Sequence, residues 1–127
     1  MTAPADRTYL QTHEWHKLEE GLVVIGVSQP AVDELTDITY LEVAKASGPI
    51  EAGESFGEIE SVKATSELYC GVAGEVVEVN QAVLDEPGII NEDCYGRGWV
   101  LKVRPADPAA VEGLLTAEAY QAEHAGS

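Results

Sequence analysis

Basic side chains are scarce in this chain of 127 residues, which has 7 lysine and arginine residues against 23 aspartate and glutamate residues. Its formal net charge is −16 at pH 7. Nucleic-acid phosphates and anionic lipid headgroups would repel such a surface, so we expect the protein to bind neither nucleic acid nor membrane. The charge favours solubility, and it also allows a basic protein partner, whose approach the field would accelerate.

Cysteine is rare too, since the sequence contains only Cys70 and Cys94. A disulfide framework needs more cysteines. Neither this pair nor the neighbouring His13 and His16 has the spacing of a zinc site, so we predict no metal site. Two free thiols in a reducing compartment fit the pair, and a single disulfide bridge is the alternative.

Long apolar runs are missing, because no segment approaches the roughly 20 residues that a membrane-spanning helix needs. The first residues also lack the basic region followed by an apolar one that marks a secretory signal. We therefore expect a cytoplasmic location, or the mitochondrial matrix if a transit peptide has been removed.

Short β-branched segments separated by glycine turns make up most of the chain, which is typical of a β sandwich or a small barrel. Strands are predicted at residues 22–27, 38–43, 56–62, 68–72, 75–80 and 98–103. Helices are predicted at residues 29–35, 108–115 and 117–123. Ser28 is a good N-cap for the first helix. The pattern indicates one mainly β domain over residues 1–127, ordered from about residue 8 to 122, with short peripheral and C-terminal helices.

One lysine stands at the turn between two predicted strands. Lys63 follows Glu58 and Glu60 and precedes Glu67 in the sequence. A turn between strands fixes the backbone and lets the side chain project into solvent, where an enzyme can reach the amine. We interpret Lys63 as the attachment point of a swinging cofactor arm. For the lysine taken alone, an ordinary surface residue is the alternative.

The segment Glu60-Ser61-Val62-Lys63-Ala64 closely resembles the lipoylation site of the glycine cleavage system H protein family. The resemblance extends over nearly the whole chain from Tyr9 to Tyr120. Its further motifs are Thr12-His13-Glu14-Trp15, Gly71-Val72-Ala73-Gly74-Glu75-Val76, Asn91-Glu92-Asp93, Tyr95-Gly96-Arg97-Gly98-Trp99 and Glu118-Ala119-Tyr120.

The resemblance implies a lipoyl-domain-like β sandwich, a barrel-sandwich hybrid, that carries covalent lipoate on Lys63. It implies a monomeric, non-catalytic carrier that shuttles an aminomethyl group during glycine catabolism. The implied partners are a pyridoxal-phosphate glycine decarboxylase, a tetrahydrofolate-dependent aminomethyltransferase, a dihydrolipoyl dehydrogenase and a lipoyl-attaching enzyme. The redox and carbanion chemistry belongs to the cofactors, while the protein contributes positioning.

In this family the loaded arm rests in a cleft on the carrier surface. The resemblance places Thr12, Glu14 and Glu67 near the arm's amine, where a carboxylate can hold a cation by a charge-assisted hydrogen bond. The chain departs from the family pattern at residues 28–36, close to that cleft. Gln29 replaces the usual acid there, and Glu34 is a further candidate contact.

Two other functions stay open at the level of sequence. The altered segment at residues 28–36 suggests an H-like relay that passes lipoyl or octanoyl groups to other lipoyl-dependent proteins. An unmodified binding scaffold is the second alternative. We do not expect an enzyme, because no nucleophile–base pair and no metal-binding constellation is present in the sequence.

Overall fold

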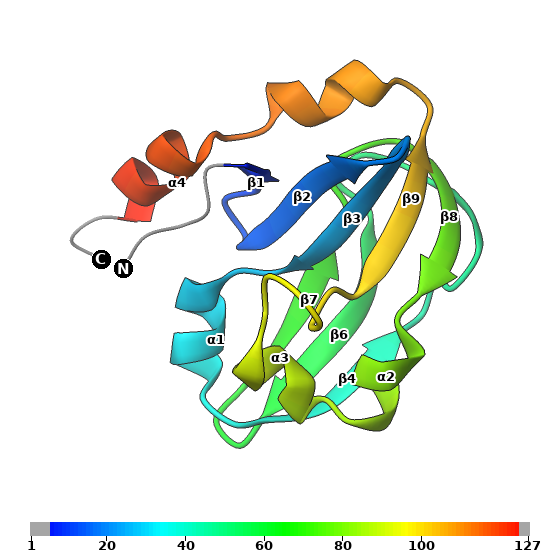
Figure 1. Ribbon diagram of the computed structural model, residues 1–127. Coiled ribbons are helices and arrows are strands. Elements are labelled where there is room, and N and C mark those ends of the chain that lie inside the picture. The colour runs from blue at the N-terminus through cyan, green and yellow to red at the C-terminus, as the bar shows by residue number, and fades with distance from the viewer. Residues whose placement is uncertain (1–5, 125–127) are drawn as a thin grey trace.

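Two β-sheets packed face to face form the body of the protein in a computed structural model that describes residues 6–124 (Figure 1). The predicted loose ends at residues 1–5 and 125–127 lie outside the described part. All strand pairs are antiparallel. The larger sheet contains, in spatial order, β1 (Thr8–Tyr9), β2 (Glu14–Glu19), β3 (Leu22–Val27), β9 (Leu101–Pro105), β8 (Gly74–Val79) and β5 (Gly48–Ile50). The smaller sheet contains β4 (Ile38–Val43), β6 (Ser55–Ser61) and β7 (Thr65–Tyr69).

Short helices cover the ends and edges of this sandwich (Figure 1). They are α1 (Gln29–Leu35), α2 (Gln81–Asp85), α3 (Gly88–Glu92), the 3-10 helix η1 (Pro108–Gly113) and α4 (Ala117–His124). The mainly β architecture with peripheral helices agrees with the sequence prediction.

One apolar core fills the space between the sheets. The strands bury most of their β-branched and leucine side chains in this core and leave most of their acidic side chains exposed, with Glu14 of β2 as a buried exception. The buried strand residues include Val23, Ile25, Val76 and Val103 from the larger sheet and Leu41, Ile59 and Leu68 from the smaller one. Cys70 and Cys94 are also buried and are free thiols, so the single bridge considered above is absent.

A second apolar cluster attaches the C-terminal helix to the outer side of the larger sheet. The ring of Tyr120 in α4 stacks on Tyr9, with centroids 4.7 Å apart and planes 8° apart. The Tyr120 hydroxyl lies 2.6 Å from the hydroxyl of Ser28, which directly precedes α1. Ser28 also donates a hydrogen bond to the carbonyl of His13 at 2.9 Å. The predicted side-chain cap is therefore wrong, because this hydroxyl joins three segments and makes no bond to the amides of α1.

The strand predictions agree best where the β-branched pattern is strong. The strands at residues 22–27 and 38–43 and the helix at 29–35 are confirmed to the residue. The strand expected at residues 68–72 is wrong in position, since β7 begins at Thr65 and ends at Tyr69. The expected helix at residues 108–115 is a shorter 3-10 helix, and the sequence prediction missed α2, α3 and the strand nature of β2.

Close backbone contact between β4 and β6 gives the most direct test of the smaller sheet. A Cβ atom added at Gly57 would lie 2.1 Å from the carbonyl oxygen of Glu42, so the two strands would have to separate. We expect Gly57→Ala to lower the free energy of unfolding by about 1–3 kcal/mol, as overpacking usually does. Gly88→Ala is the matched control, because its Cβ would meet nothing within 4 Å. Urea unfolding that shows equal stability for the two variants would contradict this packing.

Candidate functional site

A tight hairpin between β6 and β7 presents Lys63. The amide of Ser61 donates to the carbonyl of Ala64 at 2.9 Å and closes the turn. The hydroxyl of Ser61 accepts the amide hydrogens of Lys63 at 3.1 Å and of Ala64 at 3.0 Å. Because this serine satisfies the turn's own amides, the backbone beneath Lys63 is held while its side chain is exposed. The prediction of a projecting turn thus agrees with the geometry.

Lys63 differs from the other lysines in its electrostatic surroundings. Lys17, Lys45 and Lys102 each lie within 4.0 Å of a carboxylate oxygen. Among residues 6–124, no such ion pair involves Lys63. Its amine is therefore the lysine nitrogen most open to an acylating enzyme.

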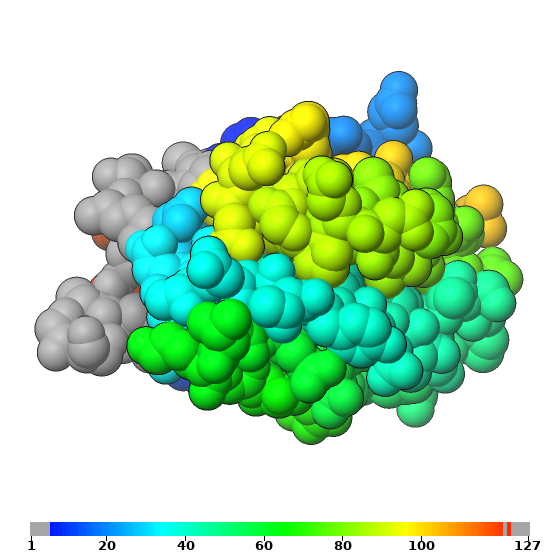
Figure 2. Space-filling model, turned by 90° about the horizontal axis from the view of Figure 1, so that it is seen from below, coloured from blue at the N-terminus to red at the C-terminus, as the bar shows by residue number. Residues whose placement is uncertain are grey.

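A cleft of about 300 Å³ runs beside the hairpin, between β7 and α1. Figure 2 looks at this end of the molecule and shows the green hairpin segment at the surface next to the cyan segment that includes α1. The cleft volume is at the lower end of the range for small-molecule sites. Apolar side chains from both sheets and α1 line the cleft: Val27, Ala31, Leu35, Ile59 and Leu68. Its polar lining includes Thr12, Glu34, Ser66 and Glu67.

Three of the four predicted arm contacts meet in this cleft. Thr12 comes from the loop before β2, Glu34 from α1 and Glu67 from β7. Both glutamates are exposed. The Glu67 carboxylate accepts a hydrogen bond from the Tyr69 hydroxyl at 3.1 Å. Two acidic residues from different walls therefore line one cavity, which suits a cationic group.

Glu14 does not line the cleft but is buried behind Thr12, with 1% of its surface exposed. One carboxylate oxygen accepts the Tyr69 amide hydrogen at 2.8 Å. The other makes a short hydrogen bond with the Thr12 hydroxyl. Burial is the main influence on this carboxylate and raises the pKa of Glu14 to about 7. Without the family resemblance, Glu14 would be taken for one of many exposed acidic residues, and its burial shows that this interpretation is wrong.

The unusual segment at residues 28–36 turns its altered side chain away from the cleft. Gln29 donates from its side chain to Asp33 at 2.8 Å, and its amide donates to the Tyr95 hydroxyl at 2.9 Å. The residues of α1 that reach the cleft are Ala31, Glu34 and Leu35. The replacement of an acid by Gln29 therefore lies at the start of α1 beside Tyr95 and Cys94, and Gln29 does not line the cavity.

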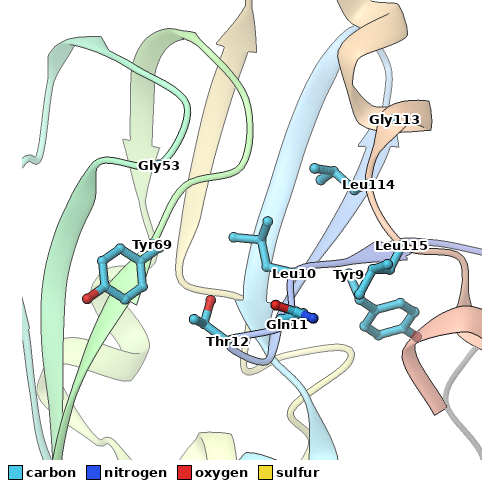
Figure 3. A pocket seen from close by; sticks show the side chains of 9 residues that line it. All are labelled: Tyr9, Leu10, Gln11, Thr12, Gly53, Tyr69, Gly113, Leu114 and Leu115. Atoms are coloured by element: carbon cyan, nitrogen blue, oxygen red, sulfur yellow. The ribbon is translucent and has the colours of Figure 1, made fainter. Parts of the chain in front are cut away.

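A larger cavity of about 520 Å³ lies beyond Thr12, away from the hairpin tip (Figure 3). Leu10, Leu114 and Tyr69 are among the residues that surround it. Thr12 lines both cavities, so it forms the partition between them. Sequence reasoning missed this cavity, because its leucines come from segments about a hundred residues apart. The smaller cavity is the better candidate site because it reaches Ala64, the neighbour of Lys63.

Comparison with known proteins agrees with this geometry. The sequence profile described as "Glycine cleavage H-protein" matches residues 7–126. The chain belongs to the glycine cleavage H-protein family. It is 44% identical over 122 residues to the glycine cleavage system H protein of Acinetobacter baumannii, covering 96% of this chain and 98% of that one. It is also 44% identical over 119 residues to the protein of the same name from Myxococcus xanthus, covering 94% and 92%.

A solved structure of a glycine cleavage system H protein from Mycobacterium marinum has the same fold. The two chains share 38% identity with a TM-score of 0.87, over 95% of this chain and 98% of the other. The predicted lipoyl-domain-like β sandwich is therefore confirmed. Family membership also confirms a carrier rather than an enzyme, and it does not favour the relay alternative.

Two negative observations apply to the part of the chain that the structure describes. Among the side chains that the structure describes, no group of three or more histidine, cysteine, aspartate or glutamate residues is arranged to bind a metal ion. None of the described helices has the length and apolar character required to cross a membrane.

The buried Glu14 predicts a distinctive pH dependence of stability. Its pKa of about 7 in the folded protein compares with about 4.3 in an unfolded chain. The folded state therefore binds the proton more tightly, and the free energy of unfolding falls as the pH rises through this interval. Relative to Glu14→Gln, we expect the unmutated protein to lose about 2–3 kcal/mol between pH 5 and pH 8.

Urea unfolding at a series of pH values measures this difference directly. Glu58→Gln is the control, because Glu58 is exposed on β6 and its removal should leave the decline in place. If the unmutated protein and Glu14→Gln show parallel pH profiles, Glu14 does not titrate in this range.

Proposed function

We propose that this chain is the lipoylated carrier of a glycine cleavage system and that Lys63 bears the lipoyl group. The observation that carries the proposal is the placement of an unpaired lysine at a fixed hairpin tip, directly beside a cleft with an apolar interior and acidic walls. The whole chain of residues 1–127 would act as one carrier domain. It would shuttle an aminomethyl group from glycine decarboxylase to the aminomethyltransferase.

The residues of the cleft suit the two parts of such an arm. Val27, Ala31 and Leu35 offer apolar surface to a methylene chain. Glu34 and Glu67 offer carboxylates to a protonated amine at its end. When bound, lipoate supplies the sulfur that carries the group, and the chain's own residues hold and shield the loaded arm. Exclusion of bulk water from this cleft would slow hydrolysis of the cargo.

Glu14 supports this site from behind. Its carboxylate fixes both the Thr12 hydroxyl and the Tyr69 amide, so it orients one wall of the cleft. A carboxyl group whose pKa lies near 7 could also accept a proton from the cargo amine through Thr12. We therefore assign Thr12, Glu34 and Glu67 to direct contact with the arm and Glu14 to their support.

The proposal implies four protein partners and a cellular site. A lipoyl-attaching enzyme would modify Lys63, and the pyridoxal-phosphate decarboxylase would load the arm. The tetrahydrofolate-dependent aminomethyltransferase would unload it, and dihydrolipoyl dehydrogenase would reoxidise the dithiol. We place this monomeric carrier in the cytoplasm, where the negative charge would favour basic docking surfaces on these partners.

Attachment at Lys63 predicts a specific mass change. In a host that lipoylates its proteins, we expect intact-mass measurement to show one lipoyl group on the chain and none on Lys63→Arg. Lys102→Arg is the matched control and should be modified as fully as the unmutated protein. Mixing the modified protein with glycine and an active decarboxylase should then add one aminomethyl mass. A bare mass in the unmutated protein, or acyl transfer from Lys63 to another carrier, would contradict the proposal.

The acidic walls predict a shorter lifetime of the loaded arm when they are neutralised. We expect Glu67→Gln and Glu34→Gln each to speed hydrolysis of the cargo about two- to fivefold, since exposed charge pairs contribute roughly 0.5–1 kcal/mol. Glu58→Gln removes a neighbouring charge outside the cleft and serves as the control. Mass spectrometry against time measures the decay. Equal lifetimes in all four proteins would show that these carboxylates do not hold the amine.

A further inference from the structure

The strand that borders the cleft has an unpaired edge. β7 is the last strand of the smaller sheet, whose order is β4-β6-β7, so β6 pairs with only one of its sides. The other side faces the cleft, where residues 64–68 lie opposite Ala31 and Leu35 of α1. A strand edge presents backbone N–H and C=O groups that need partners.

The hydrogen bonds at both ends of β7 show which residues face outward. The Ala64 carbonyl accepts from Ser61 at 2.9 Å, and the Cys70 amide donates to the Glu54 carbonyl at 3.0 Å. Even-numbered residues thus point their backbone groups toward β6, since the direction alternates along a strand. Consistent with this, the Tyr69 amide points the other way, to the Glu14 carboxylate.

Thr65 and Glu67 therefore direct their backbone N–H and C=O groups into the cleft. Within residues 6–124, no strand pairs with this side of β7. The structure also records no hydrogen bond from these outward groups to the described residues. Of the three outward amides of β7, only that of Tyr69 is already satisfied within the fold.

An acylated lysine brings one new polar group into this cleft. Acylation replaces the charged amine by an amide, which has one N–H donor and one C=O acceptor. An amide that leaves water without gaining a new partner is costly, and on the wall opposite β7 the side chains of Ala31 and Leu35 in α1 are apolar. An arm that lies in the cleft therefore needs a hydrogen-bond partner beside its amide.

An extended lysine side chain is about as long as two residues of a β-strand. The five bonds from the lysine Cα to its Nζ are each about 1.5 Å long, and each advances roughly 1.25 Å along an extended zigzag, so together they reach about 6 Å. Two residues of a strand advance about 6.6 Å. The amide on Lys63 therefore comes level with Thr65 when the arm lies along β7, and the rest of the acyl chain passes Glu67 toward Thr12.

We propose that the outward backbone edge of β7, at Thr65 and Glu67, binds the amide of the acylated Lys63 side chain. Because N–H and C=O of one trans amide point in opposite directions, the arm makes a single hydrogen bond to this edge at a time. Its carbonyl accepts from the amide of Thr65 or Glu67. The inference rests on the proposed attachment at Lys63, but it does not depend on the cargo.

Amide hydrogen exchange by NMR tests the proposal on the full chain. Two forms labelled with nitrogen-15 are compared: the bare protein and the protein octanoylated at Lys63, which has the same side-chain amide and no sulfur. We expect the amide hydrogen of Thr65 or Glu67 to exchange at least threefold more slowly in the octanoylated form. The Val62 amide, which already donates to the Asp37 carbonyl at 3.2 Å, should not change. Equal exchange in both forms, with full octanoylation verified by mass, overturns the proposal whatever the decarboxylase experiment gives.

Two variants separate the backbone edge of β7 from the hydroxyl of Ser66. Ser66 also lines the cleft, so its side chain is the competing partner. We expect Ser66→Ala to keep the slowed exchange, and loss of it would overturn the backbone assignment. Thr65→Pro removes one outward N–H at an edge position where proline is tolerated. In this variant, the slowed amide exchange should move to Glu67, or the lifetime of the loaded arm should become severalfold shorter. If neither quantity changes, the Thr65 amide does not bind the arm.

Discussion

A buried carboxylate joins the two sheets, and the position of the cleft depends on it. Glu14 belongs to β2 of the larger sheet, yet it accepts the amide hydrogen of Tyr69 at the end of β7 in the smaller sheet. A buried hydrogen bond to a charged or titrating group is strong, and its loss leaves an unsatisfied donor. This contact fixes how far β7 lies from the loop that bears Thr12. The hydrogen bond between Glu14 and the Tyr69 amide, rather than further apolar packing, therefore connects the two sheets beside the cleft.

The carrier site combines a rigid part and an open part. The hairpin turn is fixed by Ser61, whose hydroxyl satisfies the amides beneath Lys63. The Lys63 side chain is exposed and is not in an ion pair with any described residue. Such an arrangement leaves the attachment point well defined while the attached group can move between the cleft and solvent. The same cleft offers an apolar wall, two carboxylates and an unpaired strand edge, which are the features that a long amide-linked arm with a cationic end requires.

Much of the fold follows from local sequence, and much of the site does not. The β-branched run at residues 22–27 identifies β3, because its side chains fit a buried strand. The five-residue helices α2 and α3 were missed, since they are too short for a helical period and the residues between and at the start of them, Glu86-Pro87-Gly88, are typical of a turn. Lys63 could be singled out from its position in a turn between strands. The burial of Glu14 could not, because its partner Tyr69 lies 55 residues away along the chain.

The C-terminal helix reaches the cleft indirectly. Tyr120 stacks on Tyr9, and its hydroxyl meets that of Ser28 at the start of α1, the helix that forms one wall of the cleft. During synthesis on the ribosome, both β6 and β7 emerge long before Tyr120 does. A nascent chain can therefore expose the hairpin that bears Lys63 before Tyr120 is present to contact Ser28 at the start of α1. The carrier thus acquires the finished resting place for its arm only after the segment that contains Tyr120 has been made.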